Sequence, residues 1–251
     1  MQPVVFLHGL IGPFCDERAV AHLRPAVVLN PDLLGYGAEA GVNPGGITIG
    51  AQVEYVRAVL DDKAPSTGVH LVGHSAGGVV AASFAHRYPD RVDSFVSVEG
   101  NFTLADAFWS GQVSAATPAQ VTAMLEADRA DPARWLRESG VAPTGDRIRS
   151  AAEALAYQPA STIQATARAV VQYTGLPGYE RLLKEVFDHT AVHLVAGARS
   201  RAGWDVPEWA LTAAASYTEV ADAGHMVMLE APDSFGKVLA ELIAGPGDRG
   251  N

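Results

Sequence analysis

The sequence contains a single cysteine, Cys15, among its 251 residues. One cysteine cannot form an internal disulfide, which fits a reducing compartment, and we expect Cys15 to be a small buried apolar residue. No apolar run approaches the length that a membrane span requires, and no basic n-region or cleavage signal follows Met1. The sequence therefore predicts a cytoplasmic protein that has no membrane partner.

Clusters of basic residues are also missing. The chain has 18 Lys and Arg against 28 Asp and Glu, a formal net charge of −10. Because nucleic-acid binding depends on neutralising phosphates, we expect no nucleic-acid partner. The histidines show neither HExxH nor Cys/His spacing, so we expect no metal. The predicted partner is a small-molecule substrate, and the sequence leaves the oligomeric state open.

Short apolar runs alternate with segments of helical spacing over most of the chain, of which 48% is apolar. The expected strands are 3–7, 26–29, 68–72, 92–98, 192–196 and 217–220. The expected helices are 16–23, 48–62, 76–88, 207–215 and 232–243. Buried strands in alternation with helices predict an α/β fold, with a doubly wound, mostly parallel sheet of about six strands.

This alternation stops after Gly100 and resumes about ninety residues later. The intervening sequence is mostly amphipathic helix, punctuated by glycine and proline. We therefore expect a core formed by residues 1–100 and 190–244, with a helical cap inserted at 101–189. Residues 245–251 are predicted to be a flexible tail.

A serine lies in a glycine-rich segment between an expected strand and an expected helix. Gly73-His74-Ser75-Ala76-Gly77 fits the pattern G-x-S-x-G, in which small residues flank the serine because the turn is tight. The strand-turn-helix context is the one that this pattern requires. We predict that Ser75 is a nucleophile, the alternative being a capping serine in a glycine-rich turn.

His225 follows Gly224 between the last expected strand and the last expected helix. A serine hydroxyl is a weak nucleophile until a base removes its proton, and histidine is suited to this near neutral pH. We predict that His225 is this base; otherwise it is a surface-loop histidine. The backbone N–H groups of Leu10 and Ala76 are expected to bind the oxyanion, and His8 and His74 are expected to be structural.

Four segments together resemble the α/β-hydrolase superfamily: His8-Gly9-Leu10, the loop 31–37, the serine turn and Gly224-His225. These four segments are spread along the chain from end to end, apart from the expected cap. The resemblance implies a doubly wound sheet, no cofactor, and hydrolysis mostly of ester, lactone, amide or carbon-carbon bonds. Since the chain begins at the strand before the oxyanion loop, the resemblance implies six strands.

The acid that orients the histidine departs from the common pattern. Most members of the superfamily place an Asp soon after the next-to-last strand, where this chain has Arg199 and Ser200. Asp205 is the nearest carboxylate there, although a helix cap or surface ion pair explains it equally well. Glu99 ends an apolar strand, and a buried carboxylate requires a partner.

The placement of Glu99 resembles that in some haloalkane dehalogenases and in zearalenone lactonase-like hydrolases. We favour Glu99 as the acid and keep Asp205 as the alternative; a structural pair with an arginine is the other interpretation of Glu99. A dehalogenase is not expected, because those enzymes use an Asp nucleophile and this chain has Ser75.

These residues predict a serine hydrolase in which Ser75 attacks an acyl carbon, His225 acts as base and then acid, and Glu99 holds its tautomer. Trp109 and Trp135 in the cap favour an apolar or aromatic substrate, although aromatics at helical spacing are also typical of a core. We predict cleavage of an ester or lactone through an acyl-enzyme. The alternatives are a carbon-carbon bond hydrolase and a ligand-binding receptor with little turnover.

Overall fold

The computed structural model describes residues 2–13, 16–65 and 68–244. The strands are β1 (Val4–Leu7), β2 (Val28–Leu29), β3 (Val69–His74), β4 (Val92–Val98), β5 (Ala191–Gly197) and β6 (Ser216–Val220). The helices outside the cap are α1 (Glu17–Ala21), α2 (Ile49–Lys63), α3 (Ala76–Arg87), α9 (Tyr179–His189), α10 (Glu208–Ala213), α11 (Val227–Glu230) and α12 (Pro232–Ile243). Cys15 and the expected tail at 245–251 lie outside the described residues.

The six strands form one sheet in the order β2-β1-β3-β4-β5-β6, and every neighbouring pair is parallel. This confirms the predicted doubly wound sheet. Strands β1, β3 and β4 are largely buried because both faces of the sheet are covered; Val4 and Val5 of β1, for example, are wholly buried. Since all strands are parallel, their carboxyl ends meet at one edge, where open α/β sheets place their ligand sites.

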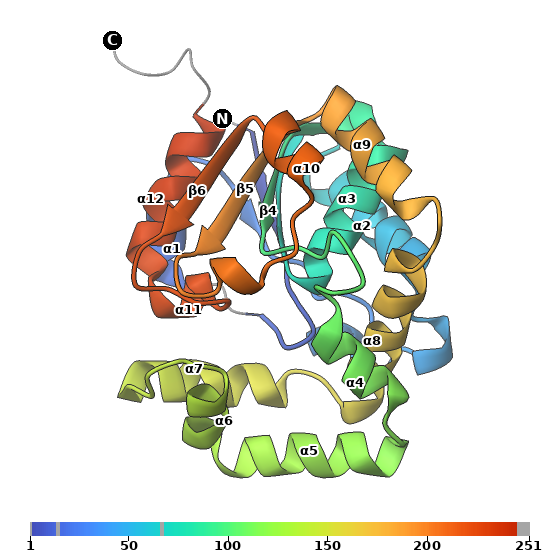
Figure 1. Ribbon diagram of the computed structural model, residues 1–251, viewed down its shortest axis with the longest axis vertical. Helices are drawn as coiled ribbons and strands as arrows, with labels where there is room; N and C mark the ends of the chain where they lie inside the picture. The colour runs from blue at the N-terminus through green and yellow to red at the C-terminus, as the bar shows by residue number, and fades with distance from the viewer. Residues whose placement is uncertain (1, 14–15, 66–67, 245–251) are drawn as a thin grey trace.

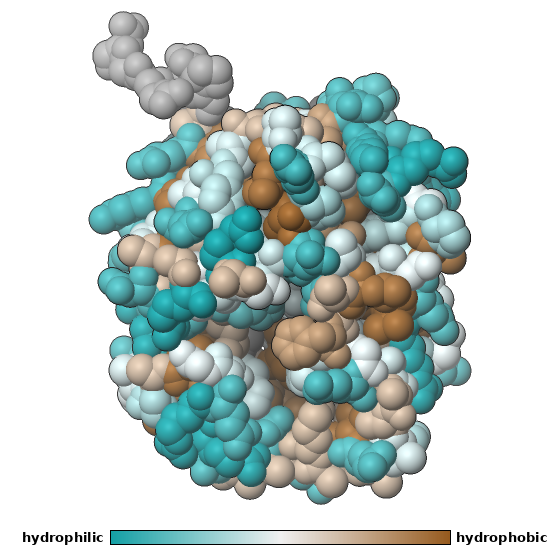
Figure 2. All heavy atoms as spheres, in the orientation of Figure 1, coloured by the Kyte–Doolittle hydropathy of each residue, from teal (hydrophilic) through white to brown (hydrophobic). Residues whose placement is uncertain are grey.

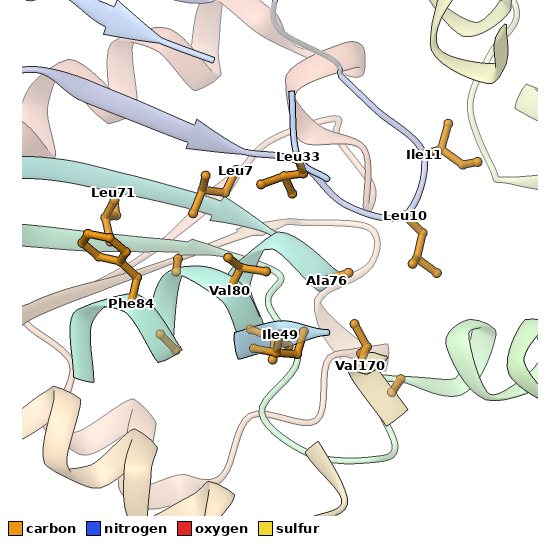
Figure 3. Packing of buried hydrophobic residues seen from close by; sticks show 14 of the residues in the cluster. Leu7, Leu10, Ile11, Leu33, Ile49, Leu71, Ala76, Val80, Phe84 and Val170 are labelled. Carbon is orange, nitrogen blue, oxygen red and sulfur yellow. The ribbon is translucent and has the colours of Figure 1, made fainter. Parts of the chain in front are cut away.

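Helices cover both faces of the sheet (Figure 1). On one face α1 packs on α12, and Val96, Phe235 and Leu239 belong to the apolar cluster there. On the other face α2 packs on α3, which contacts β1, β3 and β4. Figure 3 shows Leu71 and Phe84 in this second cluster, which extends to the carboxyl edge of the sheet. The two clusters hold the strands from which the site residues project.

The chain between β4 and β5 forms six helices, five of which lie beyond the carboxyl edge of the sheet (Figure 1). These five, which we call the cap, are α4 (Phe108–Ala115), α5 (Pro118–Ala130), α6 (Pro132–Glu138), α7 (Gly145–Ala156) and α8 (Ala160–Thr174). Within the cap, α4 packs on α8, and α5 packs on both α7 and α8.

Helix α9 lies within the expected cap range, yet it packs on α3 and β5. Its buried residues Tyr179, Leu183 and Val186 follow helical spacing and face the sheet layer. By its contacts α9 belongs with the core, so the cap boundary moves from the expected residue 189 to the end of α8. The sequence did not distinguish a cap helix from a core helix, because an amphipathic helix has the same pattern whichever surface it covers.

Candidate active site

Ser75 lies in the sharp turn between β3 and α3. Its backbone adopts φ 51° and ψ −122°, a conformation that non-glycine residues rarely accept and that active sites often contain. The turn is held by two backbone hydrogen bonds, from Ser75 N to Val98 O at 3.1 Å and from Gly78 N to Ser75 O at 2.8 Å. A Cβ at Gly77 would lie 2.1 Å from the carbonyl oxygen of Leu7. Glycine is therefore required where the turn approaches β1.

Glu99 follows β4 directly and also has a positive φ, 44°. Its side chain is 4% exposed, and its two carboxylate oxygens have different partners. Oε2 lies 2.8 Å from Nδ1 of His225, while Oε1 accepts hydrogen bonds from Gly197 N at 2.8 Å and from the hydroxyl of Ser200. Burial alone would raise the pKa of Glu99, but the hydrogen bond and charge of His225, with the bonds from Ser200 and Gly197, hold it below its usual value.

His225 lies in the segment between β6 and α11, with its ring about half exposed. An ionised Glu99 can only accept a hydrogen bond, so Nδ1 of His225 carries the proton in this pair. In a neutral imidazole Nε2 is then left with a lone pair, which can take a proton from a hydroxyl group. Glu99 thus selects the tautomer that a general base needs.

The histidine segment is tied to the serine turn through His74. The ring of His74 donates from Nε2 to the backbone carbonyl of His225 at 2.9 Å, and the two rings lie 4.8 Å apart. Burial and, after it, the charge of His225 lower the pKa of His74 to about 3, so His74 remains a neutral donor. This hydrogen bond brings the segment that carries His225 beside the residue preceding Ser75.

Among the described residues the backbone N–H groups of Leu10 and Ala76, near Ser75, donate to no backbone acceptor. Ala76 is the first residue of α3, so its N–H points out of the helix. Leu10 belongs to the segment after β1, which Tyr36 anchors by donating from its hydroxyl to Leu10 O at 3.1 Å. Leu10 and Ala76 both lie at the cap end of the apolar cluster in Figure 3.

His8 lies at the start of the same segment and is buried against the edge of the Tyr36 ring, 4.5 Å between centroids. Its Nδ1 is 2.9 Å from Gly9 O, and burial lowers its pKa to about 4. A neutral ring packed in this way shapes the segment that presents Leu10.

Asp205 lies apart from the pair formed by Glu99 and His225. Its carboxylate accepts a hydrogen bond from the Thr103 hydroxyl at 2.7 Å, and its backbone N–H donates to Asp106 at 2.7 Å. Asp205 is exposed, and these contacts join the segment after β5 to the entry of the cap. The structure brings Glu99, not Asp205, to the imidazole.

The two cap tryptophans differ in their surroundings. Trp135 on α6 is 9% exposed and belongs to the main apolar cluster, whereas Trp109 on α4 is partly buried against it. Trp135 therefore packs mainly within the cap, and Trp109 retains surface that a ligand could contact.

The sequence did not indicate that Ser200 contacts Glu99 or that Glu230 supports the histidine segment. Glu230, in α11, is buried; its Oε1 accepts from Gly224 N at 2.7 Å and its Oε2 from Arg199. Arg199 also donates to Gly140 O in the cap at 3.0 Å, and Arg147 of α7 donates to Glu230 O at 2.6 Å. Only the tertiary fold brings these residues together, so local patterns could not reveal them.

Residues 2–13, 16–65 and 68–244 contain no group of three or more His, Cys, Asp or Glu side chains arranged to hold a metal ion. Over the same residues, none of the helices has the length and apolar character of a membrane span.

A parallel sheet with a strained serine turn, a histidine after its last strand and a buried carboxylate defines the α/β-hydrolase class. Residues 4–237 match the alpha/beta hydrolase family, and the chain belongs to it. A carboxylesterase structure from the thaumarchaeon Nitrososphaera gargenis covers 97% of this chain and 90% of its own, with a TM-score of 0.70 and 15% identity. That identity supports the fold alone.

Curated relatives match over shorter stretches. Lipase 1 of Psychrobacter immobilis is 26% identical over 113 residues, 45% of this chain and 34% of the lipase. The 2-hydroxy-6-oxo-2,4-heptadienoate hydrolase of Pseudomonas putida is 32% identical over 142 residues, 51% of this chain and 50% of that enzyme. The matches thus span between a third and half of these relatives.

Proposed function

We propose that the chain is a serine hydrolase that cleaves a carboxylic ester or lactone through an acyl-enzyme. The observation that carries the proposal is the 2.8 Å contact between Glu99 Oε2 and His225 Nδ1, which leaves Nε2 as a proton acceptor. The hydrogen bond from His74 brings that histidine beside the strained turn of Ser75. The similarity to Lipase 1 supports an ester as the bond that is cleaved.

In the proposed mechanism Ser75 Oγ attacks the carbonyl carbon while His225 Nε2 takes the hydroxyl proton. The carbonyl oxygen becomes an oxyanion, which accepts hydrogen bonds from the N–H groups of Leu10 and Ala76. Collapse expels the alcohol, which receives the proton from His225, and leaves an ester on Ser75. Water then attacks this acyl-enzyme by the same steps, and the acid product and free Ser75 are released.

The proposed substrate is a small apolar or aromatic molecule. Figure 2 shows the surface hollowed at the boundary between core and cap, with hydrophobic residues nearby. Leu104 and Phe108, at the entry to the cap, are exposed, and Trp109 follows them. The formal net charge of −10 also favours an uncharged molecule over a polyanion. A lactone agrees with the resemblance of Glu99 to the acid of zearalenone lactonase-like hydrolases.

A carbon-carbon bond hydrolase is the second candidate, because one relative is a 2-hydroxy-6-oxo-2,4-heptadienoate hydrolase. The same serine, histidine and acid can serve either bond, so the residues around Ser75 do not separate the two activities. The third candidate is a receptor that retains the fold with little turnover. A kinetic measurement of turnover distinguishes it from the two hydrolases.

The test compares wild type with Ser75→Ala on p-nitrophenyl esters, macrocyclic lactones and a vinylogous diketone. We expect turnover of an ester or lactone that Ser75→Ala abolishes while its unfolding midpoint stays near that of wild type, because the hydroxyl contributes to chemistry and little to packing. More than a few per cent of residual rate would exclude Ser75 as the nucleophile. Turnover of the diketone alone would support the second candidate, and one stoichiometric burst without turnover the third.

A further inference from the structure

The carboxylate of Glu99 has a second side-chain partner besides His225. Its Oε1 accepts a hydrogen bond from the hydroxyl of Ser200, in the segment after β5, and another from Gly197 N at 2.8 Å. Oε2 is thereby left to His225. Each oxygen has its own set of donors, so the plane of the carboxylate is fixed.

The Ser200 hydroxyl has one proton and two acceptors within reach. The second is the carbonyl oxygen of Gly197, at 3.2 Å. An ionised carboxylate is the stronger acceptor, so the proton goes to Glu99 while Glu99 is charged. If Glu99 is protonated, the hydroxyl can turn to Gly197 O. The hydroxyl therefore stabilises specifically the charged form that pairs with an imidazolium.

We propose that Ser200 is a positioning residue, whose hydroxyl holds the Glu99 carboxylate in the orientation and ionisation state that His225 requires. The inference rests on the proposed function. Ser200 does not touch the substrate in this scheme; it acts on the imidazole through Glu99.

The backbone around Ser200 does not depend on this hydroxyl. Ser200 N donates to Gly197 O at 3.1 Å, Arg199 N to Ala223 O at 3.0 Å, and Gly203 N to Ser200 O at 2.9 Å. These bonds remain when the side chain is shortened to alanine. The effect of Ser200→Ala should therefore fall on Glu99 rather than on the fold.

Removing the hydroxyl leaves Glu99 Oε1 with Gly197 N as its donor. A less stabilised carboxylate takes up a proton at higher pH, so the bond between Glu99 and His225 should break at a higher pH in Ser200→Ala than in wild type. At neutral pH we expect kcat to fall about tenfold with KM unchanged. The lost hydrogen bond stabilises the charged carboxylate of Glu99, which acts in the chemical step and not in substrate binding.

The experiment compares Ser200→Ala with two matched variants. Ser200→Thr keeps the hydroxyl. Ser216→Ala removes a hydroxyl that lies 2.8 Å from Nδ1 of His193, at the start of β6 and far from the carboxyl edge. The first readout is the rate at which a fluorophosphonate labels Ser75. The second is the downfield proton resonance of the His225 Nδ1–H, which reports the bond to Glu99 without any substrate.

We expect slower labelling in Ser200→Ala, wild-type labelling in Ser216→Ala, and recovery of most of the rate in Ser200→Thr. Wild-type labelling in Ser200→Ala overturns the inference, and so does a loss that threonine does not restore. If wild type itself is not labelled, the proposed function fails and the resonance decides the role of Ser200. A resonance shifted in Ser200→Ala but not in Ser216→Ala then supports the inference, and an unshifted one overturns it.

Discussion

Glu99 reaches His225 from the end of β4, whereas the segment after β5 contributes Ser200 to the same carboxylate. A glutamate suits this position because its extra methylene extends the carboxylate across to the segment that follows β6. Burial of a charged group is expensive unless it is fully bonded, and the three donors of Glu99 meet that requirement. Glu99 thus supplies the carboxylate, and Ser200 supplies a hydroxyl that donates a hydrogen bond to it.

Glu99→Gln removes the negative charge that faces Nδ1 of His225. The amide can no longer accept the Nδ1–H with a negative charge or stabilise an imidazolium, so the chemical step should slow far more than binding. The corresponding amide substitution in a serine protease lowers kcat about 10⁴-fold, and we expect kcat here to fall by about 10³ to 10⁴. The measurement is kcat and KM on the best ester or lactone found.

Asp205→Asn is the matched control for that experiment. Asn can still accept the Thr103 hydroxyl, and Asp205 is exposed, so kcat should change by no more than about threefold. Each variant must first show the unfolding midpoint of wild type, because a loosened fold also lowers activity. If Asp205→Asn is the inactive variant and Glu99→Gln remains active, Asp205 is the acid.

At the scale of elements, the segment carrying His225 is held from two sides. His74 bonds the carbonyl of His225, and buried Glu230 bonds the N–H of Gly224. Arg199 pairs with the Glu230 carboxylate and also donates to the cap at Gly140 O. The segment is thus anchored to the serine turn on one side and to the cap on the other.

Arg199→Met tests the second anchor. The substitution leaves the Glu230 carboxylate buried with Gly224 N as its remaining partner, and we expect the free energy of unfolding to fall by about 2 kcal/mol. Adding Glu230→Gln removes the stranded charge while its amide oxygen still accepts from Gly224 N. The double variant should therefore be more stable than Arg199→Met in urea unfolding. Equal stability of wild type and Arg199→Met would show that the pair contributes nothing.

The elements themselves were largely predictable from the sequence. Short runs rich in apolar and small residues, bounded by turn residues, predicted all six strands, with 92–98 matching β4 in full. The positions of Ser75, Glu99 and His225 at strand ends followed from the same runs. Local patterns could not predict side-chain pairing: the bond from Ser200 to Glu99 joins residues 101 apart in sequence, and that from Arg199 to Glu230 joins residues 31 apart. The amphipathic pattern of α9 likewise did not indicate whether this helix packs on the cap or on the core.

At the scale of the whole molecule, burial of neutral histidines makes stability depend on pH. His8 and His74 are both buried, with pKa values lowered by burial from 6.5 to about 4 and about 3. Below pH 6.5 the unfolded chain binds protons at these positions while the folded chain does not. Folded stability is therefore lost as pH falls from 6.5 toward 4. His70 and His193, whose pKa values are also lowered by burial, add to the same trend.

We expect His8 and His74 together to lower the free energy of unfolding by about 2 to 3 kcal/mol between pH 6 and pH 5, since each contributes at most about 1.4 kcal/mol per pH unit. Over this interval both stay neutral in the folded chain, whereas burial raises the pKa values of Asp106 and Asp128, which act with the opposite sign. Urea unfolding at half-unit steps from pH 8 to pH 5 measures the slope, and the interval from pH 8 to pH 7 serves as the internal control. His8→Phe keeps a ring against Tyr36 and should remove about half of the slope contributed by His8 and His74, whatever the substitution does to stability at pH 7. A slope unchanged by His8→Phe would mean that His8 is protonated in the folded protein, which would contradict its placement as a neutral, buried support of the Leu10 segment.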